Sequence, residues 1–256
     1  MTGYRITPAR VVRAEWHKLW TVRSTWITLL TAAALTLGIG VTMGATYESG
    51  GNDSDMDVVV LTLIGFQLAQ IAIAVLGILV TAGEYSNGMI RASMTAVPRR
   101  QPVLWSKAVV FGAASFAVIL VTALVTFFAA QIFFSGTDQA ASLGDPGVIR
   151  AVVGSAAGVA LLGMIALGLG ALVRSVPGAI GAFIGVVLVL PQVLTMLPYD
   201  VMEDVVRHFP AGALTSLNSA QPVPDAASPG VGLLSLVLWA AGVLVAAALL
   251  LRRRDV

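Results

Sequence analysis

The chain has 256 residues, of which 57% are hydrophobic and only 11% are charged, and its mean hydropathy is +0.90. Soluble domains are about a quarter charged, so this composition excludes a single water-soluble globule and indicates that apolar side chains face lipid. The absence of cysteine excludes disulfides, thiolate metal sites and a cysteine nucleophile. The net charge is only +2, and the basic residues do not cluster on a soluble region as in proteins that bind nucleic acid.

The number of membrane crossings follows from the uncharged stretches, because a spanning helix needs about 20 mostly apolar residues. Six stretches without Asp, Glu, Lys, Arg or His meet this requirement: 26–46, 59–82, 108–134, 151–173, 176–197 and 231–251. We therefore expect an all-α integral membrane protein with six transmembrane helices in a single domain, residues 1–256. A cleaved signal peptide is the alternative for the first stretch, but 25 residues precede it and it is long enough to span.

The basic residues predict the orientation, because short basic loops stay in the cytoplasm. With six crossings, all but two of the 15 lysines and arginines fall on the side of the termini: Arg5, Arg10, Arg13, Lys18, Arg23, Arg91, Arg99, Arg100, Lys107, Arg174, Arg252, Arg253 and Arg254. The other side has Arg150 and Arg207 together with most of the acidic residues. Both termini are therefore expected in the cytoplasm.

Residues 7–23, before the first span, predict a helix that lies on the inner membrane surface. Thr7 can cap this helix and Pro8 suits its first turn. One face is apolar and the other is basic, as in interfacial helices that meet lipid phosphates: Val12, Trp16, Leu19 and Trp20 against Arg10, Arg13, His17 and Lys18. A simple topology anchor is the alternative reading.

The segment 83–107, between the second and third spans, predicts a short amphipathic helix from about residue 89 to 96. Pro98 would end it, because the residue before a proline avoids helical geometry. Arg91 and Thr95 would share one face, which suits docking into a groove of a soluble partner. An ordinary basic loop is the alternative.

A family resemblance favours the docking interpretation. Glu84-Tyr85 followed by Gly88, Ile90-Arg91, Pro98-Arg99 and Lys107 resembles the pattern in permease subunits of the type-2 export class of ATP-binding cassette (ABC) transporters. The N-terminal helix with Glu15 and Lys18-Leu19, the six spans and the long external segment 198–230 are also similar to that family. Met89 departs from the pattern, since such proteins often carry threonine there.

The resemblance implies that segment 83–107 carries a coupling helix seated in a cleft of a cytoplasmic ATPase subunit, which the N-terminal helix also touches. The implied residues at or behind this contact are Glu84, Tyr85, Gly88, Arg91 and Arg99. For Gly88 and Pro98, the alternative role is to shape the turn. The implied fold is a permease in which two copies, or two related chains, enclose a path.

Glycines four residues apart allow close helix contacts, and three such pairs lie in the spans. They are Gly40/Gly44, Gly154/Gly158 and Gly181/Gly185. The resemblance implies that helices one and five form the dimer interface, which makes Gly40, Gly44, Gly181 and Gly185 the interface candidates. Packing within one subunit is the expected use of two of the three pairs.

The chain has no motif of an ATPase or another enzyme. A phosphate-binding loop ends a glycine-rich turn in Lys and Ser or Thr, and neither Lys18 nor Lys107 follows such a turn. His17 and His208 lie outside the spans on opposite sides, so they do not form an intramembrane metal site. The acidic run 53–57 begins like a calcium loop, but Val58 replaces the required glycine, which favours a solvated loop. ATP and magnesium are thus expected on a separate ATPase subunit, with no cofactor bound by this chain.

The predicted function is the permease subunit of an ATP-driven exporter in a bacterial plasma membrane. Uncharged spans favour an amphipathic or hydrophobic cargo, such as a drug, antibiotic, peptide or lipid-like molecule. An excess of arginine over lysine is associated with GC-rich bacterial genomes. An ion-coupled secondary transporter is the main alternative, although such carriers usually keep ionisable residues inside their spans. A passive channel or a membrane assembly factor that transports nothing is also open.

Two further structural expectations concern the second half of the chain. Pro191-Gln192 is expected to interrupt the fifth span. Alternating apolar and charged residues over 200–209 predict a short amphipathic helix at the outer surface. Residues 208–212 would break this helix, and Pro222, Pro224 and Pro229 would keep the rest extended. Similar permeases use this external region as a gate, and a long covered loop is the alternative.

Overall fold

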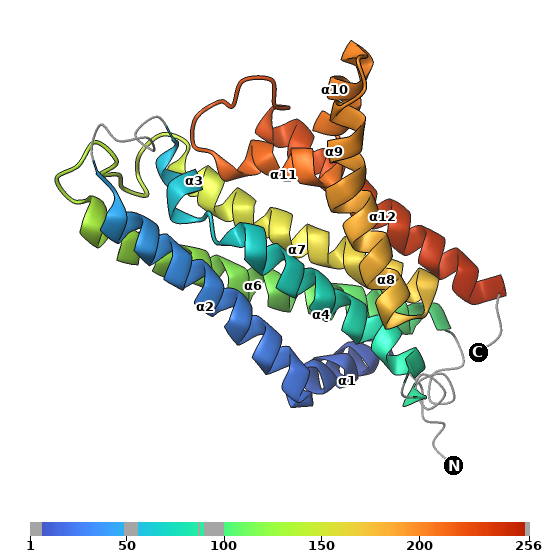
Figure 1. Cartoon of the computed structure of the whole chain (residues 1–256). Helices are drawn as coiled ribbons and strands as arrows, with labels where there is room; N and C mark the ends of the chain where they lie inside the picture. The colour runs from blue at the N-terminus through green and yellow to red at the C-terminus, as the bar shows by residue number, and fades with distance from the viewer. Residues whose placement is uncertain (1–6, 49–55, 87, 90–99, 254–256) are drawn as a thin grey trace.

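The computed structural model describes residues 7–48, 56–86, 88, 89 and 100–253. This part of the chain is helical, and its long helices form one bundle (Figure 1). In chain order the elements are α1 Pro8–Thr21, α2 Arg23–Thr46, α3 Val58–Thr62, α4 Phe66–Ser86, α6 Arg100–Phe134, α7 Val148–Val173, α8 Val176–Phe183, the π-helix η1 Ile184–Val189, α9 Leu190–Thr195, α10 Asp200–Arg207, α11 Pro210–Asn218 and α12 Pro229–Arg253.

Six helices of the described chain are long and apolar enough to cross a membrane, which confirms the predicted fold class. They are Arg23–Thr46, Phe66–Ser86, Gln101–Phe134, Val148–Val173, Val176–Thr195 and Pro229–Arg252. The helix that contains the third of them, α6, has 35 residues and a length of about 52 Å at 1.5 Å per residue. This exceeds the apolar thickness of a bilayer, about 30 Å. The first turns of α6 therefore extend beyond the predicted apolar stretch 108–134.

The most buried span, α7, packs against α4, α6 and α12 and forms the centre of the bundle. Glycines bring α4 and α7 together, because a Cβ atom at Gly77 would collide with the carbonyl oxygen of Gly163. One turn further along, Thr81 Oγ1 donates a hydrogen bond of 2.8 Å to the carbonyl oxygen of Leu167 on α7. Small residues and an interhelical hydrogen bond are what hold spans together where lipid removes the hydrophobic driving force.

The second predicted span, 59–82, is not one continuous helix. A short helix, α3, is capped by Asp57, whose carboxylate accepts hydrogen bonds from the backbone of Val59 at 2.8 Å and Val60 at 3.3 Å. A turn then precedes α4, and Gly65 in this turn lies against the backbone of Leu35 and Thr36 of α2. The continuous span therefore begins at Phe66, after a turn at which Gly65 packs directly on the backbone of α2.

The fifth span is deformed just before Pro191. The six residues of η1 form a π-helix, and Leu190 donates its N–H to the carbonyl oxygen of Gly185, five residues back. A proline has no N–H to donate and its ring clashes with the carbonyl four residues earlier, so a wider turn relieves the conflict. The interruption is thus a π-turn before Pro191, and the helix continues through α9. In Figure 1, α8 and α9 rise away from the other spans.

The segment 198–230 is more helical than its prolines suggest. As expected, an amphipathic helix, α10, ends at Arg207 and a break follows at His208. The expectation of an extended remainder is wrong for Pro210–Asn218, which forms α11 and packs against α7 and α12. Pro210 and Pro229 each occupy the first turn of a helix, where the missing N–H leaves no hydrogen bond unmade.

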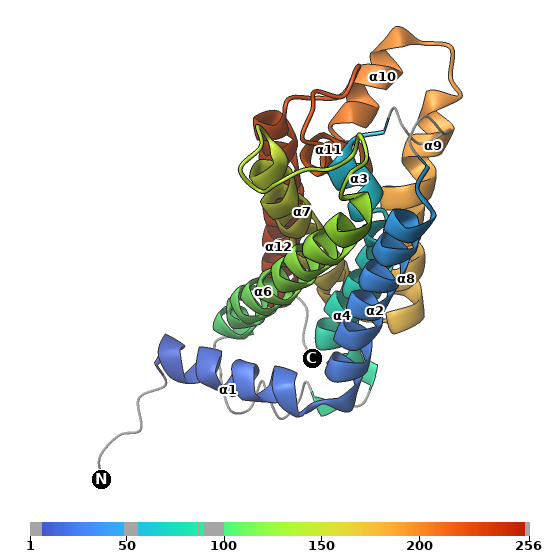
Figure 2. The ribbon, with the colours of Figure 1, turned by 90° about the vertical axis from the view of Figure 1, so that its left-hand side faces the viewer.

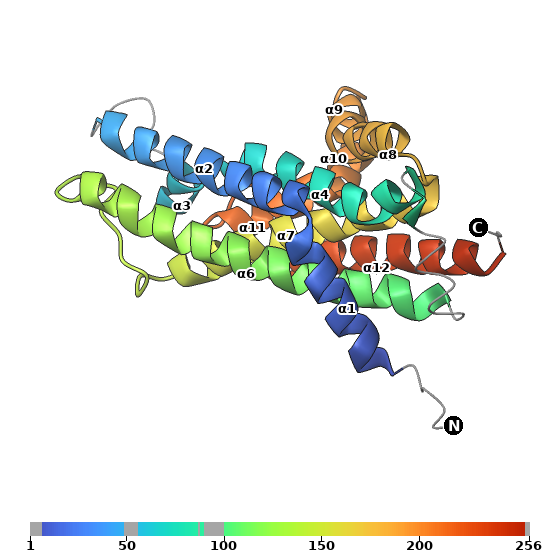
Figure 3. The ribbon, with the colours of Figure 1, turned by 90° about the horizontal axis from the view of Figure 1, so that it is seen from below.

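The N-terminal helix α1 lies across one end of the bundle in Figure 2, and it crosses the direction of the spans when they are seen from below in Figure 3. We call this end, where α4 ends and α6 begins, the α1 end. The helix is confirmed, although Thr7 makes no side-chain capping hydrogen bond at its N-terminus. Its buried residues, Val11 and Leu19, face the bundle, and Leu19 packs against Val110 of α6.

Candidate functional site

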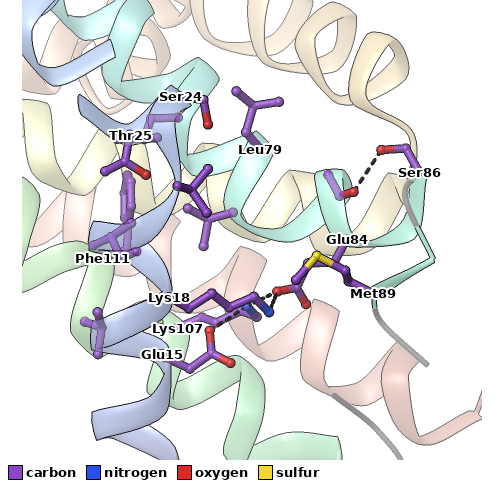
Figure 4. Close-up of a pocket in the computed structure, with 16 residues that line it drawn as sticks. Glu15, Lys18, Ser24, Thr25, Leu79, Glu84, Ser86, Met89, Lys107 and Phe111 are labelled. Carbon is purple, nitrogen blue, oxygen red and sulfur yellow. Dashed lines mark hydrogen bonds and ion pairs between the residues drawn. The ribbon is translucent and has the colours of Figure 1, made fainter. Parts of the chain in front are cut away.

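Four charged side chains meet at the α1 end in a cluster that we call the ion cluster: Glu15 and Lys18 of α1, Glu84 of α4 and Lys107 of α6. Lys107 Nζ lies 2.6 Å from Glu15 Oε2 and 2.6 Å from Glu84 Oε1. Lys18 Nζ also pairs with Glu84 Oε1 (Figure 4). The side chains of Lys107 and Glu84 are 4% and 6% exposed, so the pairs are shielded from water.

The position of these charges near helix ends, and their mutual pairing, explain why they are tolerated in the bundle. Each lies within two helical turns of the end of its helix, beside apolar contacts that hold α1 against α6. Buried charges need compensating partners, and here two ammonium groups face two carboxylates. The cluster is therefore electrically neutral as a whole and joins α1 to the end of α4 and the start of α6. Glu84 Oε2 is the exception, because it is buried and accepts no hydrogen bond from the described residues.

A cavity of about 300 Å³ opens beside the ion cluster, between α1, α2, α4 and α6 (Figure 4). Most of its wall is apolar and includes Leu76, Leu79, Val80, Val110 and Phe111. The polar part of the wall consists of the ion cluster together with hydroxyl groups at the first turn of α2 and the end of α4: Glu15, Lys18, Glu84, Lys107, Ser24, Thr25 and Ser86. Cavities of this size with a few convergent polar groups are typical ligand sites.

The residues predicted to contact an ATPase subunit fall into two groups. Glu84 and Tyr85 lie inside the bundle: Glu84 in the ion cluster, and Tyr85 under the guanidinium of Arg174, whose Cζ is 5.1 Å from the ring centroid. Gly88 is exposed and has a positive φ of 74°, a left-handed turn that favours glycine. Arg91 and Arg99, with most of the expected coupling helix, lie outside the described residues.

Arg174, which ends α7, was not among the residues predicted to act at this end. It adopts the left-handed region with φ 59° and ψ 15°, an unusual conformation for arginine, and its N–H donates to the carbonyl oxygen of Gly170. Its Nε and Nη2 atoms are buried and have no hydrogen-bond partner among the described residues. The sequence shows only a basic residue between the fourth and fifth spans, so position alone does not reveal that it stacks on Tyr85.

The sequence analysis also did not predict that four residues form one cluster: Glu15, Lys18, Glu84 and Lys107. Lys18 was expected to face lipid phosphates with Arg10, Arg13 and His17, but it turns toward Glu84 and is 24% exposed. The sequence does show opposite charges that could pair: Glu84 and Lys107 at the two ends of 84–107, and Glu15 and Lys18 on the preceding amphipathic helix. That signal does not specify how α1 folds back on α6, which decides the pairing.

The glycine pairs differ in what faces them. At Gly40 a Cβ atom would collide with Thr62 and Thr126, and at Gly44 it would lie 3.2 Å from the carbonyl oxygen of Ala130. This pair therefore packs against α6 and the end of α3 in the same chain, and the dimer contact predicted there stays a prediction. Gly154 and Gly158 similarly face α11.

Gly181 and Gly185 differ from the other pairs because their surroundings are open. An added Cβ atom at either position would have no described atom within 4 Å. Both lie on the fifth span, which is the least buried of the six in this chain. This glycine pair is thus still available to a second copy.

A scan against models of protein families and a search of curated proteins both found no match to this chain. No group of three or more possible metal ligands occurs among the described histidine, aspartate and glutamate residues. The composition and the helix lengths establish a multi-pass helical membrane protein with six candidate spans. A more specific function has to be argued from the α1 end and from the resemblance of residues 84–107.

Proposed function

We propose that the chain is the membrane-spanning subunit of an ATP-driven exporter and that a separate cytoplasmic ATPase docks at the α1 end. The observation that carries the proposal is the ion cluster. It fastens the surface helix α1 to the end of α4 and the start of α6, between which the expected coupling segment lies. A displacement of that segment would move α1, α4 and α6 together, because buried ion pairs resist separation.

The distribution of charge inside the spans supports an external energy source. The apolar stretches have no Asp, Glu, Lys, Arg or His, and Glu84 of α4 and Lys107 of α6 lie near the ends of their helices in the ion cluster. Carriers driven by protons or sodium usually keep such residues at membrane depth. ATP binding to a partner would instead bias the helices, and the shift can be no larger than the difference in ATP binding energy between the two states.

The path for cargo would lie between two copies. The fifth span leans away from the bundle and leaves Gly181 and Gly185 uncovered, a surface suited to close contact between helices. A path between apolar spans suits an amphipathic or hydrophobic cargo. Whether the second chain is identical or related does not change the requirement for this face.

Copurification of the ATPase tests the proposal. The tagged chain is isolated from its source membranes, bound proteins are identified by mass spectrometry, and the complex is assayed for ATP hydrolysis. Gly88→Pro is expected to abolish the association, because proline cannot adopt the φ of 74° at this turn. The matched control is Gly136→Pro, which alters another left-handed glycine, φ 86°, at the opposite end of the bundle.

Binding that survives both Gly88→Pro and Arg91→Glu would contradict the docking site. If no ATPase copurifies and the purified chain moves cargo in vesicles under an ion gradient alone, the secondary-transporter alternative is correct. An exporter is supported only if ATP hydrolysis by the complex also requires an intact turn at Gly88.

A further inference from the structure

The cavity at the α1 end combines a large apolar wall with a small charged area. Residues such as Leu76, Leu79 and Phe111 form the apolar wall, and the ion cluster forms the charged area (Figure 4). Its volume, about 300 Å³, is within the range of sites that hold a small ligand or part of a larger one. A ligand with both an alkyl chain and a charged group matches this wall, whereas a soluble ion leaves its apolar part unmatched.

Lys18 is the charged group of the cavity wall that is most accessible to a ligand. Its side chain is 24% exposed, more than that of any other member of the ion cluster. Among the described residues its ammonium donates to one acceptor, Glu84 Oε1. A lysine ammonium has further N–H donors, so Lys18 can bind an anionic group of a ligand while it keeps its ion pair. The Glu84 carboxylate is too deeply buried to compete for that ligand.

The charges around the cavity favour a negatively charged ligand. The ion cluster itself is neutral, and the other charged side chains that the structure describes at this end are all basic: Arg10, Arg13, Arg23, Arg174 and Arg252. Arg23 lies between Val22 and Ser24, which both line the cavity. Charges of one sign beside apolar walls raise the local concentration of the opposite ion. An anion is therefore attracted to this cavity more strongly than a cation or a zwitterion.

The surroundings of the cavity have the character of the boundary between lipid chains and water. The α1 helix crosses this end of the bundle, where Trp16, Trp26 and Trp105 are exposed (Figure 2). Tryptophan is enriched at that boundary in membrane proteins. Two residues of the cavity wall, Val22 and Met89, are also exposed, so the cavity opens to the outside of the bundle. A membrane lipid in this leaflet is thus within reach of the cavity.

We propose that this cavity binds an anionic phospholipid, of which phosphatidylglycerol is the simplest example. The phosphate accepts a hydrogen bond from the ammonium of Lys18, and an acyl chain lies along the wall that includes Leu79. Phosphatidylcholine has the same phosphate and chains, but its ammonium would lie among basic side chains. Binding therefore requires both the net negative charge and the acyl chain. This inference does not depend on an ATPase partner.

Native mass spectrometry of the purified, delipidated full chain tests this site. Phosphatidylglycerol and phosphatidylcholine with identical acyl chains are titrated separately, and glycerol phosphate represents the charged group without a chain. We expect phosphatidylglycerol to bind about tenfold more tightly than phosphatidylcholine, a difference of about 1.4 kcal/mol, and glycerol phosphate not to bind measurably at the same concentrations. Equal binding of phosphatidylcholine, or of glycerol phosphate, would overturn the proposal.

A variant in the apolar wall locates the bound chain. Leu79→Trp fills the cavity without altering any charge, so it should weaken binding of phosphatidylglycerol by about tenfold. The matched control, Leu68→Trp, places the same residue at an exposed position of the same helix and should bind as the unaltered chain does. Undiminished binding by Leu79→Trp would show that the lipid lies elsewhere and would overturn the proposal.

A variant of the accessible lysine locates the phosphate. Lys18→Gln should lower the affinity for phosphatidylglycerol to about that for phosphatidylcholine, because the ammonium that meets the phosphate is removed. Arg13→Gln is the control, since it removes the same charge from an exposed position of α1 that does not line the cavity. An equal loss of affinity in both variants would mean that general surface charge holds the lipid, contrary to the proposal. If Lys18→Gln does not fold, the result with Leu79→Trp decides.

Discussion

Lys107 is the residue that completes the ion cluster, because its ammonium group contacts Glu15 and Glu84 at the same distance, 2.6 Å. Lys107→Met should lower the free energy of unfolding by about 3–5 kcal/mol, since it leaves buried carboxylates without their main partner. The measurement is thermal unfolding of the purified chain in detergent. Arg13→Met, which removes a positive charge from an exposed position of α1, is the control and should have little effect.

A double variant separates the ion pair from the packing of the lysine stem. Lys107→Met combined with Glu84→Gln should be less destabilised than the sum of the two single variants, because the double variant leaves no unpaired charge between α4 and α6. Additive effects would mean that the two side chains act independently. In that case the cluster would not be the fastening between α1, α4 and α6 that we describe.

The residues of the ion cluster could be found in the sequence, but their partnership could not. Glu84 and Lys107 flank apolar stretches, and both belong, with Glu15 and Lys18, to the pattern that resembles ABC permease subunits. Lys107 and Glu15 are 92 positions apart. Their contact depends on how α1 turns back beneath α6, where Leu19 packs with Val110, and no local sequence pattern specifies that arrangement.

At the scale of elements, Asp57 fastens the start of α3 to the segment after α11. Its Oδ1 caps α3, and its Oδ2 accepts hydrogen bonds of 2.9 Å from Ser219 Oγ and from the backbone N–H of Gln221. Asp57→Ala should speed amide hydrogen exchange at Gln221 by about tenfold, the change expected for a loss of about 1.4 kcal/mol. Asp145→Ala is the control, because among the described residues the Asp145 carboxylate accepts hydrogen bonds from nearby Ser142 and not from the segment after α11. Unchanged exchange at Gln221 would show that these hydrogen bonds do not hold the segment after α11.

The exposed face of the fifth span is tested by placing a bulky side chain at one of its glycines. Gly181→Ile should weaken dimers, measured by cross-linking in detergent, because a branched side chain prevents close approach of two helices. Gly242→Ile on α12 is the control, since its Cβ atom would also meet no described atom within 4 Å. If both variants cross-link as the unaltered chain does, the second copy is held by another face.

Periodicity and apolar length were sufficient to predict which elements exist, but not where contacts interrupt them. The six spans follow from uncharged stretches, whereas the turn before Phe66 depends on Gly65 meeting the backbone of α2. Similarly, Pro210 was read as a helix breaker, although a proline in a first turn starts a helix when the following residues pack, as Leu214 does against Gly158 of α7. Sequence spacing specifies local structure, and these deviations are consequences of tertiary contact.

At the scale of the whole molecule, orientation decides whether the α1 end can meet a cytoplasmic ATPase. The positive-inside rule predicts that α1, the ion cluster and the cavity lie on the cytoplasmic side and the segment after α11 on the outer side. Because the chain has no cysteine, single cysteines can be introduced without removing any other. Asp225→Cys, at a side chain that is 91% exposed, should react with a membrane-impermeant maleimide in intact cells. His17→Cys on the exposed side of α1 should react only after permeabilisation, whereas the reverse pattern would place the ion cluster outside the cell and contradict the proposed docking of an ATPase.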